Sequence, residues 1–269
     1  MPRIWAVLIL ILLSSLPVIA VYVWFRLAKY SFSLHRFLFV LLAGATALFP
    51  AFFLQAFLNF TFHDGRAAMF YHHFIRIALS EELSRLLVLS VFFWISARIK
   101  QNDSAQLPAS PLTLNIVKKA TATGLVAGLG FALLENAIYA ASDVTVLPLR
   151  IIITAAVHAA CGARVGAAAV MLRTRPVQAI MRVLTAAAIH GVYNLMITMP
   201  GFSPITAILI AVSALFSTIL TIRGGWSSEN EEVFESGNII TLLLNKPASQ
   251  ESIFNEPPMR ELDKDKENP

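Results

Sequence analysis

The segment Phe74–Ser96, with the sequence FIRIALSEELSRLLVLSVFFWIS, combines two properties that membrane helices rarely combine. It is apolar and long enough to cross a bilayer, which takes ~20 residues. It also carries Glu81, Glu82 and Arg85 near its middle. A charge near the centre of a bilayer costs several kcal/mol, so such residues are rare and usually functional. The segment therefore predicts a membrane helix whose charged side chains serve a buried site.

The composition places the whole chain in the membrane. It has 269 residues, of which 57% are hydrophobic and only 14% charged, whereas soluble domains carry roughly 25% charged residues. A single cysteine, Cys161, excludes an internal disulfide and the usual Cys-rich zinc sites. The net charge of +5 falls mainly in loops, where it reports topology, and nothing in the sequence indicates nucleic acid as a partner.

We predict an all-α, polytopic membrane helix bundle of about seven transmembrane helices over residues 1–224. The first helix is expected to be retained, because its apolar run is longer than that of a signal peptide and its basic residues follow it. From Trp226 onward Ser, Glu, Asn, Pro and Lys dominate, which predicts a largely disordered cytoplasmic tail over residues 225–269. The predicted spans are Ile4–Phe25, Phe37–Phe57, Phe74–Ser96, Lys119–Ala141, Arg150–Leu172, Val177–Met199 and Pro204–Ile222.

The basic residues are distributed unequally between alternate loops. Most of them follow the first, third, fifth and seventh spans: Arg26, Lys29, Arg36, Arg98, Lys100, Lys118, Lys119, Arg173, Arg175 and Arg223. Since short cytoplasmic loops are enriched in Lys and Arg, we expect an extracytoplasmic N-terminus and a cytoplasmic C-terminus.

Three further spans also carry ionisable residues. Glu135 lies in the fourth span, His158 in the fifth and His190 in the sixth, where Asn194 follows one helical turn later. Two carboxylates in one helix, a third in the next and two histidines form a ligand set suited to a metal that activates water. Asn194 shares a helical face with His190, which suits a residue that orients this ligand or stabilises an oxyanion.

The depth of these residues predicts one shared site. Counted from the extracytoplasmic helix ends at 1.5 Å per residue, Glu81, Glu135, His158 and His190 lie roughly 9–14 Å below that surface. Four helices that place polar residues in one plane indicate a single site near the extracytoplasmic face.

Each residue also has a structural interpretation. Arg85 can pair with one of the two glutamates, three and four residues before it, although this leaves the other glutamate without a partner. Glu135 could pair with Arg164 or Arg150 and merely hold the bundle together. His158, surrounded by small residues, could be a helix-packing histidine.

Taken together, these motifs resemble those of the PrsW family of intramembrane proteases, which are relatives of the CAAX prenyl protease and bacteriocin-immunity superfamily. The resemblance rests on Glu81-Glu82-x-x-Arg85, Phe131-x-x-x-Glu135-Asn136, His158 and His190-x-x-x-Asn194, and it covers the first six spans. It implies site-one cleavage of a membrane-anchored regulator, such as an anti-sigma factor, near the outer face. It also implies residence in the bacterial cytoplasmic (inner) membrane.

The resemblance assigns roles by position. Glu81 and Glu82 match the catalytic acidic pair of the family, and Asn194 the oxyanion or orienting position. The positions expected to bind metal or water match Glu135, His158 and His190. Two departures stand out: Arg85 replaces a frequent lysine, and Glu135 stands where CAAX-type enzymes place histidine, which favours PrsW over a prenyl-protein substrate.

We therefore expect an intramembrane endopeptidase in which Glu81 or Glu82 deprotonates water and Asn194 or Arg85 stabilises the oxyanion. The ligand types suit zinc, yet no His-Glu-x-x-His motif is present, so metal-dependent and glutamate-only chemistry both stay open. The alternative is a non-enzymatic carrier or scaffold that uses the same residues as a relay or ion site. A carrier usually shows internal symmetry, which the sequence lacks.

The topology can be tested by cysteine labelling in a Cys161→Ala background. We expect a cysteine at position 64 to react with a membrane-impermeant reagent from the outside, because the loops around it are poor in basic residues. A cysteine at position 174 should react only from the cytoplasmic side. Labelling of position 64 from the cytoplasm alone would reverse the orientation.

Overall fold

The computed structural model describes residues 12–30, 32–103, 112, 114–142, 150–198 and 204–223, and every element in these ranges is helical. The prediction of an all-α membrane bundle is confirmed. Two predictions fall outside the described residues: the start of the first span and the cytoplasmic tail over residues 225–269. The helices are α2 Leu16–Leu27, α3 Leu34–Thr46, α4 Leu48–Phe57, α5 Gly65–Phe70, η1 Tyr71–Leu79, α6 Ser80–Asp103, α7 Leu114–Ser142, η2 Arg150–Thr154, α9 Ala155–Met171, α10 Pro176–Thr198 and α11 Pro204–Arg223.

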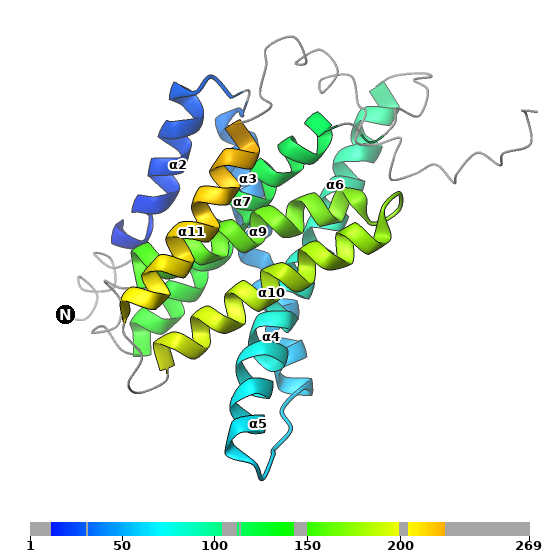
Figure 1. Ribbon diagram of the computed structural model, residues 1–269. Helices are drawn as coiled ribbons and strands as arrows, with labels where there is room; N and C mark the ends of the chain where they lie inside the picture. The colour runs from blue at the N-terminus through cyan, green and yellow to red at the C-terminus, as the bar shows by residue number, and fades with distance from the viewer. Residues whose placement is uncertain are drawn as a thin grey trace, which may run out of the picture.

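Within the described residues, five helical segments are long and apolar enough to cross a membrane: Leu34–Phe57, Leu114–Tyr139, Ile151–Met171, Pro176–Thr198 and Ile205–Arg223. The shorter apolar helix Leu12–Leu27 and the 24-residue helix α6, which carries the charged motif, complete the set. The expected number of about seven helices therefore agrees with the structure. Figure 1 shows these helices packed side by side in one bundle.

The second predicted span, Phe37–Phe57, is interrupted. Helix α3 ends at Thr46, the backbone N–H of Ala47 bonds to the carbonyl of Gly44, and α4 begins at Leu48. The physical reason is Pro50, whose ring would clash with the carbonyl four residues earlier in a continuous helix. At the third position of α4, Pro50 has no intrahelical partner to lose.

The third span begins earlier than expected. The segment between the predicted spans Phe37–Phe57 and Phe74–Ser96 contains α5, whose first turn is capped by Asp64 Oδ1 accepting from the Arg66 backbone N–H at 2.9 Å. Helix α5 then continues through the π-helix η1 into α6 without an intervening loop. Figure 1 shows that α4 and α5 project beyond the rest of the bundle.

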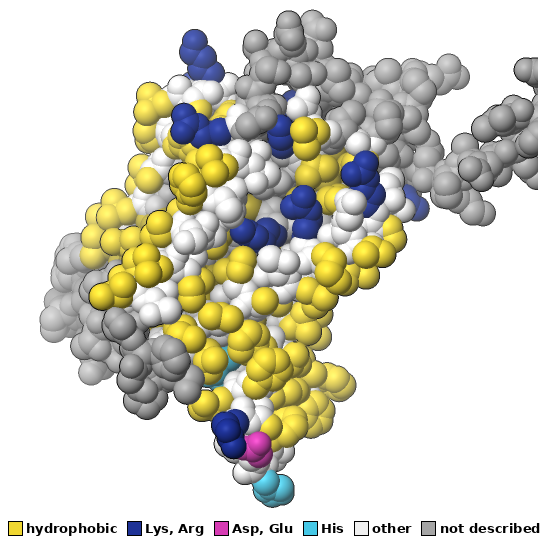
Figure 2. Space-filling view, viewed as in Figure 1, with side chains coloured by type: hydrophobic (Ala, Val, Ile, Leu, Met, Phe, Trp, Pro, Cys, Tyr) yellow, Lys and Arg dark blue, Asp and Glu magenta, His cyan; other side chains and the backbone are white. Residues whose placement is uncertain are grey.

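Close backbone contact between α7 and α9 forms the centre of the bundle. A Cβ atom added to Gly128 would lie 2.0 Å from the His158 carbonyl oxygen, and one added to Gly124 would lie 2.1 Å from that of Gly162. Small residues allow membrane helices this approach. The outer faces are apolar instead, with exposed rings such as Phe52 and Phe57, and Figure 2 shows hydrophobic side chains over much of one face.

The glycine contact predicts the effect of a single methyl group. We expect Gly128→Ala to lower the free energy of unfolding by about 1–3 kcal/mol, since the added carbon collides with backbone that cannot rotate away. Thermal unfolding in detergent measures this loss. Gly65→Ala is the matched control, because a Cβ there meets nothing within 4 Å. Equal midpoints for the two variants would contradict the prediction.

Candidate active site

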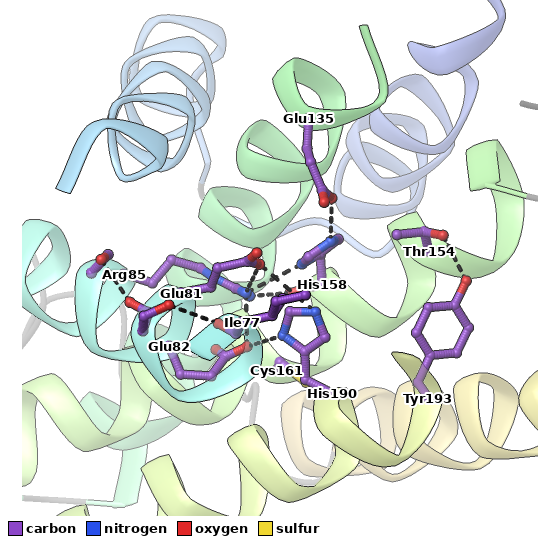
Figure 3. A network of polar contacts seen from close by, with 12 residues as sticks. Ile77, Glu81, Glu82, Arg85, Glu135, Thr154, His158, Cys161, His190 and Tyr193 are labelled. Carbon is purple, nitrogen blue, oxygen red and sulfur yellow. Dashed lines mark hydrogen bonds and ion pairs between the residues drawn. The ribbon is translucent and has the colours of Figure 1, made fainter. Parts of the chain in front are cut away.

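Six of the seven predicted site residues meet between α6, α7, α9 and α10. Helix α6 carries three of them, and the other helices supply one each (Figure 3). All six are buried or nearly so, although they lie far apart in the sequence. They are Glu81, Glu82, Arg85, Glu135, His158 and His190.

Arg85 is the centre of this cluster and is completely buried. Its Nη2 atom lies 2.7 Å from Glu82 Oε1 and 3.6 Å from Glu81 Oε2, and its guanidinium group stands 4.6 Å from the ring centroid of Phe131. The same nitrogen lies 3.2 Å from His158 Nδ1. One cation thus balances two carboxylates inside the membrane and also contacts the histidine of α9.

Each histidine is paired with a carboxylate. His190 Nδ1 lies 2.9 Å from Glu82 Oε1, and His158 Nε2 lies 2.8 Å from Glu135 Oε2. Arginine can only donate, so His158 Nδ1 accepts from Arg85, and its Nε2–H donates to Glu135. The same reasoning makes His190 Nδ1–H the donor to Glu82.

This pattern leaves a lone pair on one nitrogen of each ring. They belong to His158 Nδ1, which accepts from Arg85 Nη2, and to His190 Nε2, and the ring centroids lie 4.8 Å apart. A metal ion bound by His158 would take the place of that Arg85 contact. A carboxylate that accepts from the opposite ring nitrogen is the usual way in which proteins orient a metal-binding histidine.

Glu81 supplies a third potential ligand atom. Its Oε1 accepts from Gln55 Nε2 at 3.0 Å, whereas its buried Oε2 has no hydrogen-bond partner and lies 3.7 Å from His190 Nε2. Glu81, His158 and His190 each offer one atom, and these atoms lie within 4.8 Å of one another. Since buried polar atoms rarely remain unsatisfied, the orphaned oxygen and the two imidazoles fit a divalent metal ion.

The structure refines the role that the sequence predicted for Glu135. Glu135, expected to bind metal, contacts His158 Nε2 and is not part of the three-residue ligand group. The alternative pairing of Glu135 with Arg164 does not form, because Arg164 donates to Ser217 Oγ and Thr218 Oγ1 of α11.

Asn194 lies one turn after His190 on α10 and is partly buried. Its backbone carbonyl accepts from Thr198 Oγ1 at 2.8 Å. In the described part of the chain, no hydrogen bond joins its side chain to the six clustered residues. It therefore lies one helical turn from the cluster and is not bonded to it.

Sequence reasoning missed Gln55 and Arg76. Gln55 holds Glu81 from α4, and its own carbonyl accepts from Arg76 Nε at 3.1 Å. The signal that could have found Gln55 is the one that revealed the glutamates: a polar side chain within an apolar span.

Two π-helices lie directly before the site, η1 ahead of α6 and η2 ahead of α9. π-Helical turns occur frequently at functional sites, because the extra residue shifts the following side chains to another face. η2 is held to α10 by a hydrogen bond of 2.6 Å between the hydroxyls of Thr154 and Tyr193 (Figure 3).

The central ion pair predicts non-additive stability effects. Arg85→Met should lower the free energy of unfolding by about 3–5 kcal/mol, because it strands two buried carboxylates. In the double variant Glu82→Gln/Arg85→Met one of those charges is removed, and much of the stability should return. Thermal unfolding of the single and double variants measures this coupling. Strictly additive losses would show that the pair does not act as a unit.

Comparison with known proteins agrees with this geometry. The model of the PrsW family, described as intramembrane metalloproteases, matches residues 33–221, which is well over half of the chain. No curated protein and no solved structure matches. The matched region contains all of the clustered residues, and the chain belongs to the PrsW family of intramembrane metalloproteases.

Proposed function

We propose that this intramembrane protease cleaves a membrane-anchored protein near the extracytoplasmic face, at a metal centre formed by Glu81, His158 and His190. The observation that supports the proposal is the convergence of one carboxylate oxygen without a hydrogen-bond partner and two imidazoles, each oriented by a carboxylate. As an integral membrane protein of this family, the enzyme acts on substrates within the bilayer. The carrier and scaffold alternatives are disfavoured by the family match.

Zinc is the ion that this ligand set suits best, because zinc binds imidazole nitrogen and carboxylate oxygen, and catalytic zinc sites have three protein ligands and one open position. When bound, a divalent ion supplies Lewis-acid polarisation of the peptide carbonyl and lowers the pKa of water. The remaining steps fall to side chains of the protein.

Glu82 is the residue that we assign as proton acceptor in this scheme. Its Oε1 is anchored by Arg85 and His190, whereas its buried Oε2 has no hydrogen-bond partner. That oxygen can take the proton of the attacking water and pass it to the leaving amine. The anchored oxygen keeps the carboxylate in a fixed orientation while it does so.

Arg85 and Asn194 are the groups available for the developing oxyanion. Arg85 already lies among the reactive residues, so its guanidinium can stabilise negative charge without reorganisation. Asn194 lies one turn from His190 and can orient the substrate carbonyl. Glu135 and Gln55 hold His158 and Glu81, respectively, in place.

Glutamate-only chemistry is a second candidate, and one observation favours it. Arg85 Nη2 stands 3.6 Å from Glu81 Oε2 but only 2.7 Å from Glu82 Oε1. The longer distance leaves Glu81 Oε2 less constrained by Arg85, so Glu81 could deprotonate water directly.

The side of the membrane on which cleavage occurs is inferred from the distribution of basic side chains. In Figure 2 basic side chains gather toward one end of the visible face, opposite the projecting α4–α5 region. If the basic end is cytoplasmic, α4 and α5 project on the extracytoplasmic side. A regulator of the anti-sigma type, anchored in the bacterial inner membrane, is the substrate class that the family resemblance suggests.

Metal content and turnover of two variants separate the candidate mechanisms. Under the metal scheme, Glu81→Gln should lose bound metal together with activity, because a ligand is removed. Glu82→Gln should keep the metal and lose turnover by a factor on the order of 10²–10⁴, since only the proton acceptor is lost. Elemental analysis and cleavage of a membrane-anchored peptide library measure both quantities.

The control is Asp64→Asn, which makes the same acid-to-amide change outside the site and should alter neither quantity. A protein that contains no metal, resists chelators and still loses activity on Glu81→Gln would establish the glutamate-only mechanism. Full cleavage by both glutamate variants would refute the proposed site.

A further inference from the structure

A chain of hydrogen bonds leads from the proposed metal centre toward the projecting end of the molecule. Glu81 Oε1 is held by Gln55 Nε2, and the Gln55 carbonyl accepts from Arg76 Nε. Arg76 in turn lines a cavity of about 380 Å³ between the α4–α5 loop, α5 and η1. Arg76, at the cavity, is therefore connected to Glu81 through Gln55 alone.

The walls of the cavity are aromatic and basic. They include the rings of Phe60, Phe62 and Tyr71 and the polar side chains of His72, His73 and Arg76, and no acidic residue lines it. The Tyr71 hydroxyl donates to the Leu58 carbonyl at 3.1 Å, and the Phe62 ring packs against Tyr71 with centroids 4.7 Å apart. These contacts fix the aromatic wall before any ligand arrives.

Arg76 retains unused donor capacity. Its Nε bonds to Gln55, but among the described residues its two Nη groups form no hydrogen bond or ion pair. His73 also has one free nitrogen: it is only 8% exposed, its Nε2 lies 3.1 Å from Thr198 Oγ1, and its Nδ1 has no partner. Thr198 Oγ1 donates to backbone carbonyls, so it accepts from His73 Nε2–H and the free His73 Nδ1 is an acceptor. The anion-binding group of the cavity is therefore the half-buried Arg76 guanidinium with its free Nη donors.

The position of the cavity sets its distance from the reacting bond. Arg76 precedes Glu81 by five residues on the continuous η1–α6 segment, which corresponds to about 7 Å along the axis. An extended peptide advances ~3.3 Å per residue. A substrate bound in extended form would thus place its second or third residue beyond the scissile bond at the cavity.

We propose that this cavity is a substrate subsite that binds an aspartate or glutamate side chain two to three residues to the extracytoplasmic side of the scissile bond. Arg76 donates its Nη groups to the carboxylate, and the aromatic wall packs against the methylene groups. The inference rests on the proposed function, since it takes Glu81 as part of the reactive centre. Because Arg76 also supports Gln55, occupation of the subsite is linked directly to the position of Glu81.

The test uses the full-length enzyme in liposomes and a series of single-span peptides. Each peptide carries Asp, Asn or Lys at one of the four positions outward of the cleavage site, and kcat/KM is measured for each. Wild-type enzyme should prefer Asp over Asn on the order of 10-fold or more at the second or third position. Arg76→Gln should abolish this ratio, and Arg76→Glu should shift the preference to Lys.

Arg66→Gln is the matched control. Arg66 is an exposed arginine of α5 that does not line the cavity, so its removal should leave the Asp preference intact. If kcat/KM of Arg76→Gln falls equally for Asp and Asn peptides, the subsite is refuted. Arg76 then acts by positioning Glu81 through Gln55. The same comparison is made in phosphatidylglycerol and in phosphatidylcholine liposomes. If the loss of kcat/KM in Arg76→Gln depends on the lipid and is the same for every peptide, Arg76 binds a lipid phosphate and the subsite is refuted.

Peptide binding to the Glu81→Gln variant, measured by photocrosslinking, separates the two proposals. Preferential crosslinking of Asp peptides, abolished by a second change Arg76→Gln, supports the subsite even if wild-type enzyme cleaves none of the peptides. Cleavage by wild-type enzyme without any Asp preference refutes the subsite alone and leaves the proposed function intact.

Discussion

The ion pair between Arg85 and Glu82, fully buried in the bundle, is the interaction on which the rest of the site depends. A fully buried guanidinium without a partner would cost several kcal/mol in the membrane interior, and so would two adjacent glutamates without a cation. By placing all three on one face of α6, the sequence makes the insertion of this helix possible. The same arrangement orients Glu82 toward His190 and Arg85 toward His158.

The packing of α7 against α9 supplies the second constraint. Glycines on both helices bring their backbones into contact, so the distance between Glu135 and His158 is set by main-chain atoms rather than by adjustable side chains. This rigidity matters because a metal site or a proton acceptor must be held to a fraction of an ångström. A bundle packed through larger side chains would separate these helices and open the cluster.

The site also illustrates how one carboxylate type can serve three roles. Glu135 and Glu82 accept from histidine nitrogens and thereby fix the tautomers, whereas Glu81 accepts from Gln55. Glu81 and Glu82 each keep a second, buried oxygen without a hydrogen-bond partner. What separates the roles is the set of neighbours. Gln55 constrains Glu81 without supplying a positive charge, while Arg85 lies closest to Glu82. Identical side chains therefore acquire different basicity and different access to a ligand.

The sequence by itself determined the membrane bundle, the helices that carry the site and six residues that meet there, because each charged residue in an apolar span violates the pattern that surrounds it. It did not reveal that the second span is interrupted before Pro50, nor that Glu135 contacts His158 Nε2. Gln55 and Arg76 also emerged only from the fold, since their contacts join α4 to η1 and α6. Hydropathy and spacing define which residues face the bundle interior, but the rotation and depth of each helix depend on packing with its neighbours. Only tertiary structure decides which polar atoms then come within bonding distance.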